Sequence, residues 1–524
     1  MIVTKSSIGQ FAFRGYTAFL ALFCVGIVMG SDPASNLEKD ILRIQELLTA
    51  GNLDAATAAL DQDLRQYPNE GGLYNLRGIV QAQRGDLKRA EEDFQAAIRL
   101  SPRLEGSYLN LGRLYELQAN GNNNGLASAV EIYRRGLRVD PSLEQVRLQL
   151  TKILLWQADF SGSLAVLAKM PSPESDFAKA LRMTALVGLH RDLEADRISS
   201  GKLHLTESEA LDIAPALLSH GRAEFLQKLL IEAGQRQALS PRGQRVLGEA
   251  ESALGHKEQA KTLLTQSAQA DPESPEPLLD LAKLAWDEKQ YQTALGYVAH
   301  ARDLAPDRAS IHFFFGVICI AMDLPVEARK AVEHAIQLDP SNAYYHYALG
   351  GIELQSRLPG EAKAQFEKYL ALQPGDARAH LAIGAALFEM AEYDAAKTEL
   401  LKAGSLGGAQ YYLGRVARAE GDAEEAVRYF SKALDQDPNC IECYAERGRA
   451  EIQQKDYAGA TRDLQVALKQ SPENVQANEY LLLLYQKTND PRAEAQRTRF
   501  AEVNQKHAEK QQQMLRRLDI RPTA

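Results

Sequence analysis

The chain has 524 residues, of which 45% are hydrophobic and 25% charged, so its composition is typical of a folded protein and argues against extensive disorder. A single globular core rarely extends over this length, which favours a repeat architecture in which each unit contacts only its neighbours. The formal net charge of −9 repels phosphate backbones and argues against nucleic acid as the main ligand. Four cysteines, spaced as they are here, do not form a disulfide framework.

The N-terminus has the pattern of a targeting segment. Lys5 and Arg14 precede an uncharged run over residues 15–30 with a strongly apolar centre. The run is short for a membrane-spanning helix and has the usual dimensions of a signal-peptide hydrophobic region. We therefore expect residues 1–30 to be a signal peptide and the protein to be exported, either periplasmic or extracellular. Retention as an uncleaved membrane anchor through residues 15–30 is the alternative.

Residues 37–143 are predicted to form the first helical hairpins. Apolar residues recur with helical spacing before the turn pair Gly51-Asn52, and a second helix follows over residues 53–64. Pro68 and Pro102, which end successive units, lie 34 residues apart. An Asn/Gly-rich run over residues 120–125 lengthens the third unit. Because Asn and Gly tolerate positive φ, we place this insertion in a hairpin turn.

Residues 144–240 follow the pattern less regularly, since Gly and Pro are missing from their expected places between residues 172 and 205. Pro141 and Pro272 are nevertheless separated by about four repeat lengths. We therefore predict divergent helical hairpins here rather than an inserted domain.

Residues 241–486 are predicted to form regular units, and between Pro272 and Pro374 the chain repeats itself every 34 residues. The repeat is marked by prolines, by an alanine twelve residues before each proline, and by a small residue 24 before it. These columns are Pro272, Pro306, Pro340 and Pro374; Ala260, Ala294, Ala328 and Ala362; and Gly248, Ala282, Gly316 and Gly350. A larger apolar residue stands eight places before each proline: Leu264, Val298, Val332 and Phe366. This period is typical of a helix-turn-helix solenoid. Residues 487–524 are expected to form a polar capping helix and tail.

The columns resemble the tetratricopeptide repeat, with its small residue in the eighth place, Ala in the twentieth and Pro in the thirty-second. The resemblance implies an all-α fold, a right-handed superhelical solenoid of about 12–14 helix-turn-helix hairpins. Small residues in these places let two helices approach closely. A larger side chain at Gly316 or Ala328 is therefore expected to cost about 1–3 kcal/mol through overpacking.

The resemblance also implies a binding groove, lined by the second, fifth, sixth, ninth and twelfth places of each first helix. Projected onto this chain, these places predict an aromatic groove that ends in three arginines: Phe313, Phe314, Tyr344, Tyr347, Leu381, Tyr411, Tyr412, Arg415, Arg418 and Arg449. Tyr and Arg are frequent where binding energy concentrates. The alternative is that half of the aromatic residues pack between repeats. The family's carboxylate clamp and asparagine ladder are not supported, because only Asn110 stands in a matching place.

Two further sets of residues suggest other chemistry. His312, His346 and His380 lie 34 residues apart, but helices packed about 8–10 Å apart hold them too far from one another to share a zinc ion. The motif Cys440-Ile-Glu-Cys443 opens a first helix, where a thiol can be acidified and where a local disulfide can form after export. Short motifs of this kind are weak evidence without a haem-type histidine or a strand. Cys319 is expected to be a small core residue.

The leading prediction is a non-catalytic protein–protein interaction scaffold that binds a peptide or helical segment of a partner in the groove. Export and the family resemblance suggest a role in cell-envelope assembly or secretion. No cofactor, metal or nucleic acid is expected, and membrane contact is expected only through an uncleaved N-terminal segment. One alternative is a thiol–disulfide redox protein that uses Cys440 and Cys443, and replacing both by Ser distinguishes it. The other is a structural spacer without a specific ligand, favoured if the groove residues are buried or scattered.

Overall fold

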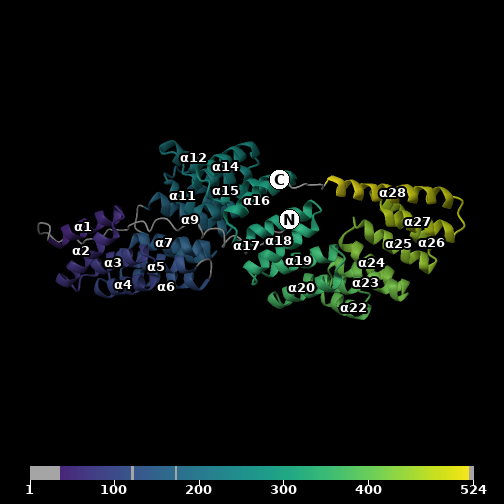
Figure 1. Cartoon of the computed structure of the whole chain (residues 1–524), viewed down its shortest axis with the longest axis horizontal. Coiled ribbons are helices and arrows are strands. Elements are labelled where there is room, and N and C mark those ends of the chain that lie inside the picture. The colour runs from purple at the N-terminus through teal and green to yellow at the C-terminus, as the bar shows by residue number, and fades with distance from the viewer. Residues whose placement is uncertain (1–35, 120–122, 171–173, 518–524) are drawn as a thin grey trace, which may run out of the picture. The chain divides into compact units, whose positions relative to one another are not determined.

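The computed structural model describes residues 36–119, 123–170 and 174–517. In these ranges the chain contains 28 α-helices and no β-strand (Figure 1). The helices pack in chain order, α1 on α2 through α27 on α28, which makes 14 hairpins of two helices each. The fold is therefore the predicted all-α repeat solenoid. The predicted signal peptide lies outside the described residues, and none of the helices described is long and apolar enough to cross a membrane.

The chain divides into two compact units, and the first of them ends at Pro272. Its described helices alternate between first and second members of a hairpin. They are α1 (Asn36–Thr49), α2 (Leu53–Gln66), α3 (Gly71–Gln83), α4 (Leu87–Leu100), α5 (Glu105–Ala119), α6 (Asn123–Val139), α7 (Glu144–Trp156), α8 (Phe160–Leu167), α9 (Asp176–Gly188), α10 (Asp192–Ser199), α11 (Glu207–Ser219), α12 (Ala223–Arg236), α13 (Pro241–Ala253) and α14 (Lys257–Ala270).

The second unit begins at Glu273 and contains the most regular repeats. Its described helices are α15 (Glu276–Asp287), α16 (Tyr291–Leu304), α17 (Ala309–Ala321), α18 (Pro325–Leu338), α19 (Ala343–Gln355), α20 (Pro359–Leu372), α21 (Ala377–Glu389), α22 (Tyr393–Lys402), α23 (Gly407–Glu420), α24 (Ala423–Gln436), α25 (Ile441–Gln454), α26 (Tyr457–Gln470), α27 (Val475–Lys487) and α28 (Ala493–Arg517). Each second helix packs on the following first helix, and first helices also touch: α21 contacts α23, and α25 contacts α27.

The middle of unit 1 departs from this regular stacking. The second helices α8 and α10 have only eight residues each. A short second helix leaves the first helices on either side of it closer together. Accordingly, the first helix α7 contacts α11 in addition to α9. Irregular spacing between residues 144 and 240 therefore accompanies a locally tighter arrangement of helical hairpins.

The repeat columns have a steric origin. A Cβ atom built on Gly350 would lie 2.6 Å from Cε1 of Phe366, and one on Gly316 would lie 2.8 Å from Cγ2 of Val332. The alanine of the twentieth place, such as Ala328, is fully buried. The two helices of these hairpins, α17–α18 and α19–α20, thus meet with no space for an additional methyl group, which confirms the close approach that the columns predict.

A backbone conformation also recurs every 34 residues, although the residue type at that place varies. Gly255, Lys289, Asp323, Arg357 and Ala391 all have φ between 58° and 83° and form the left-handed turn between the two helices of successive hairpins. Only the first is glycine, although this region of φ favours glycine by roughly 1–2 kcal/mol. The turn therefore recurs through the backbone without leaving a constant residue in the sequence.

Candidate functional site

The predicted groove residues lie on five consecutive first helices of unit 2. Helix α17 carries Phe313 and Phe314, α19 carries Tyr344 and Tyr347, α21 carries Leu381, α23 carries Tyr411, Tyr412, Arg415 and Arg418, and α25 carries Arg449. None of the ten is fully buried, and Tyr344 is the most exposed at 38%. These residues are called the groove residues below.

The aromatic groove residues have one side against the core and one side exposed. The ring of Phe313 lies 4.8 Å from that of buried Tyr345, and the ring of Tyr347 lies 5.0 Å from that of buried Tyr369. Phe314 meets Trp286 of the preceding first helix at 6.4 Å. The alternative interpretation, in which these aromatic residues pack between repeats, thus applies to one side of each ring. The packed side fixes the ring, and the exposed part remains available for contact.

Arg415 is the centre of an aromatic cluster that joins α21 and α23. Its guanidinium carbon lies 4.2 Å from the ring centre of Phe388, 5.2 Å from that of Tyr412 and 5.8 Å from that of Tyr411. Burial raises the pKa of both tyrosines, so they remain neutral hydrogen-bonding groups. The ion pair of Arg415 with Glu389 spans 3.4 Å, and the glutamate side chain is 46% exposed. Arg415 is held in place chiefly by the three neighbouring rings.

Arg418, in contrast, is committed to a buried carboxylate. Its Nε lies 3.0 Å from Oε2 of Glu446, which is 2% exposed. The hydroxyl of Tyr480 donates to Oε1 of the same glutamate at 3.2 Å, and burial followed by repulsion from Glu446 raises the pKa of Tyr480 to about 12. Glu446 was not among the predicted site residues, although it occupies the sixth place of its repeat. Two of the three predicted arginines, Arg415 and Arg449, therefore remain for a ligand.

Arg449 lies 5.9 Å from the ring centre of Tyr480 and forms no ion pair within the described part of the chain. Along the ninth places of the first helices, the order of side chains is Val317, Gly351, Ala385, Arg415 and Arg449. Gly351 is exposed, and a Cβ built on it meets no atom within 4 Å. The ninth places are thus uncharged from α17 to α21, sterically open at Gly351 and buried at Ala385, and they are cationic at α23 and α25.

Polar residues in the corresponding places of unit 1 are paired with one another. The amide of Asn110 donates to Oδ1 of Asn75 at 3.0 Å, and both side chains are buried. Lys152 and Asp212 form an ion pair of 2.7 Å in which the side chains are 9% and 13% exposed. These groups have little capacity left for a partner, so unit 2 provides the better candidate.

The histidine column has a structural explanation within each hairpin. Nε2 of His312 lies 2.7 Å from the carbonyl oxygen of Pro306, and Nδ1 of His346 and His380 lie 2.9 and 2.7 Å from Gln365 and Glu399. Across the residues described, no three His, Cys, Asp or Glu side chains are grouped to hold a metal ion. Cys319 is buried, as predicted, and burial raises the pKa of its thiol to about 11.

Sequence models of the tetratricopeptide repeat match residues 41–105, 325–377 and 381–439, and a second such model matches residues 417–477. The chain belongs to the tetratricopeptide repeat family. Members of this family bind other proteins, and the chain is a protein-interaction scaffold. No curated protein matches its sequence.

Solved tetratricopeptide repeat structures are similar to the chain only in fold. The Cut9–Hcn1 hetero-tetramer of APC/C gives a TM-score of 0.42 at 16% identity, over 86% of this chain and 96% of that one. PilF of Pseudomonas aeruginosa gives 0.34 at 23% identity, over 39% and 94% of the two chains. A tetratricopeptide repeat protein of Parabacteroides merdae gives 0.36 at 14% identity, over 46% and 97%. Similarities of this size have no bearing on the ligand.

Proposed function

We propose that the groove residues of unit 2 bind a segment of a partner protein in which apolar side chains are followed by carboxylates. The observation that carries the proposal is the change along the ninth places, from Val317, Gly351 and Ala385 to Arg415 and Arg449. Partly exposed rings flank this line throughout. Apolar surface removed from water contributes about 25 cal/mol per Å², so the uncharged section favours apolar side chains.

The cationic section favours carboxylates because its arginines can exchange their present contacts. An exposed ion pair such as Arg415–Glu389 is worth about 0–1 kcal/mol, so a carboxylate of the partner competes with Glu389 at little cost. Contact with three rings keeps the guanidinium ordered before the partner arrives. A group that is already ordered loses less entropy on binding.

The proposed setting of this interaction is the cell envelope. The support is the signal-peptide pattern of residues 15–30, which favours export and, with the scaffold fold, a role in envelope assembly or secretion. Cell fractionation and N-terminal sequencing of the native protein test this point. Recovery outside the cytoplasm with a new N-terminus near Ser31 is expected. An intact N-terminus in the cytoplasmic fraction contradicts export and leaves the groove proposal standing.

The charge requirement is tested by replacing Arg415 and Arg449 with Gln, which removes the cations and keeps most of the side-chain volume. Peptides selected for binding to the parent are measured by calorimetry against this variant and against Arg428→Gln, a control on the second helix α24 whose side chain is 67% exposed. We expect at least a tenfold loss of affinity for the double variant and none for the control. Equal affinity for all three proteins rejects the proposed groove.

A further inference from the structure

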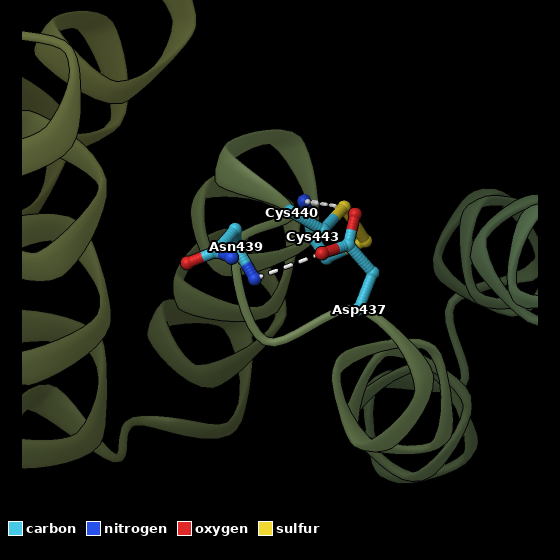
Figure 2. Close-up of a disulfide and its surroundings, with 4 residues drawn as sticks. All are labelled: Asp437, Asn439, Cys440 and Cys443. Atoms are coloured by element: carbon cyan, nitrogen blue, oxygen red, sulfur yellow. Dashed lines mark hydrogen bonds between the residues drawn. A yellow bond between two sulfur atoms is a disulfide. The ribbon is translucent and has the colours of Figure 1, made fainter. Parts of the chain in front are cut away.

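The pair Cys440–Cys443 forms a disulfide at the start of helix α25 (Figure 2). Cys440 is the N-cap residue, and the backbone N–H of Cys443 donates to its sulfur at 3.1 Å. The loop before it is held by Asp437, whose Oδ1 accepts from the N–H of Asn439 at 3.0 Å (Figure 2). The disulfide therefore lies in an ordered turn at a helix N-terminus.

The two sulfurs differ in access. Cys443 is 2% exposed, whereas Cys440 is only half-buried. A cavity of about 280 Å³ borders both cysteines, and its walls include Gly407, Gly408, Tyr411, Asp437 and Glu442. Gly407 and Gly408, at the start of α23, contribute only backbone to this lining. A thiol that enters this cavity meets Cys440 as the more exposed of the two cysteines.

We infer that Cys440 and Cys443 form a thiol–disulfide exchange site for a cysteine-bearing segment with neighbouring basic side chains. The inference does not rest on the proposed groove function. A disulfide that served only to fix the start of α25 would not require an adjoining cavity or unequal access to its two sulfurs. Asp437 and Glu442 are the charged residues of the cavity wall, and both are acidic. They attract a cationic segment and repel an anionic one.

The exchange balances as follows. A thiolate of the incoming dithiol attacks the sulfur of Cys440, the bond to Cys443 breaks, and Cys443 leaves as a thiolate that takes a proton from water. The second thiol of the same dithiol, as a thiolate, then attacks the dithiol's first sulfur, which is bonded to Cys440 in the mixed disulfide. Cys440 leaves as a thiolate. The incoming dithiol is oxidised by two electrons and the Cys440–Cys443 pair is reduced by two. The helix N-terminus stabilises the Cys440 thiolate, and Asp437 and Glu442 oppose it.

The first test uses the unaltered full-length protein. Reduction of the native disulfide is followed with three probes at equal thiolate concentration: cationic cysteamine, neutral 2-mercaptoethanol and anionic glutathione. We expect reduction without unfolding, in the order cysteamine, 2-mercaptoethanol, glutathione, with about a tenfold difference between the extremes that shrinks at high salt. Reduction that proceeds only at the rate of unfolding, or the same rate for all three thiols, overturns the inference.

The second test separates the roles of the two cysteines. In the Cys443→Ser variant, Cys440 should form a stable mixed disulfide with cystamine, because no second thiol is present to expel it. In Cys440→Ser, the buried Cys443 should react at least tenfold more slowly, as should buried Cys319. Peptide mass mapping assigns the modified cysteine. Equal reaction of both variants, or faster reaction of Cys443, contradicts the assignment of Cys440 as the exchanging sulfur.

Discussion

The steric basis of the repeat can be tested at two adjacent glycines of α19. Gly350 faces Phe366, and a Cβ placed on it would lie 2.6 to 2.9 Å from three ring atoms. Gly351 is exposed, and a Cβ placed there meets nothing within 4 Å. Replacing either glycine by alanine gives the same change in helix propensity, about 1 kcal/mol in favour of folding. The difference between the two variants therefore measures the contact with Phe366.

The expected magnitudes follow from these distances. Gly351→Ala should stabilise the protein by about 1 kcal/mol. In Gly350→Ala, overpacking of about 1–3 kcal/mol outweighs the same gain, so the net effect is a loss of about 0–2 kcal/mol. In the hairpin of α15 and α16, Ala282 and Val298 stand in the places of Gly350 and Phe366 and are both buried, so an alanine can pack beside a valine there. In a Phe366→Val background, Gly350→Ala should become stabilising, which corresponds to a coupling energy of about 1–3 kcal/mol.

Urea unfolding monitored by circular dichroism measures the four proteins of this cycle and the Gly351→Ala control. Hydrogen exchange at the amides of α19 and α20 localises the effect, because repeat arrays need not unfold as one cooperative unit. Equal stabilisation by Gly350→Ala and Gly351→Ala in the parent would refute the reasoning. It would mean that α19 and α20 have space for a methyl group between them.

Three other predictions concern the turns and the buried charges. Arg357 has φ of 60°, so Arg357→Gly should stabilise the protein by up to about 1 kcal/mol in urea unfolding, whereas Arg357→Ala should not. Burial, followed by repulsion from Asp463, raises the pKa of Glu451 from 4.5 to about 7. The folded state therefore binds this proton more tightly than the unfolded state does. The associated stability is present below about pH 4.5 and is lost as the pH rises through 7. Relative to the parent, Glu451→Gln should gain roughly 1–3 kcal/mol in free energy of unfolding at pH 8 and nothing at pH 4. Arg418→Met leaves the Glu446 carboxylate buried without its cation and should lower the free energy of unfolding by about 3–5 kcal/mol. A further Glu446→Met should recover most of this loss. If Arg418→Met is as stable as the parent, the ion pair between Arg418 and Glu446 does not contribute as described.

The sequence predicts the hairpins because their main determinants are steric and local. The residue in the place of Gly350 must be small because the residue in the place of Phe366 packs against it. This requirement recurs at a constant spacing along the sequence, so it is visible as columns. The left-handed turn at Lys289, Asp323 and Arg357 is equally regular but leaves no column. Its cost of roughly 1–2 kcal/mol is small enough for an ordinary residue to be tolerated.

The sequence predicts on which helices the groove residues lie, but it does not predict all of their contacts. The repeat period alone is enough to place residues on a given helix face. This placement puts Arg415 on the same face of α23 as Tyr411 and Tyr412, whose rings it lies beside. The commitment of Arg418 to Glu446 depends on which side chain of the next first helix lies opposite. That contact is set by the angle between repeats, which no single repeat encodes.

Site-specific photocrosslinking tests the central claim most directly. A benzoylphenylalanine replaces Gly351, whose position on α19 is exposed and sterically open, and in a control it replaces Gly296, an equally open position on the second helix α16. The probes are introduced into the full chain in its native cells, and crosslinked partners are identified by peptide mass mapping. We predict one partner segment crosslinked from residue 351 and not from residue 296, with apolar residues followed by Asp or Glu. Crosslinking from residue 296 alone, or of segments without this pattern, contradicts the account.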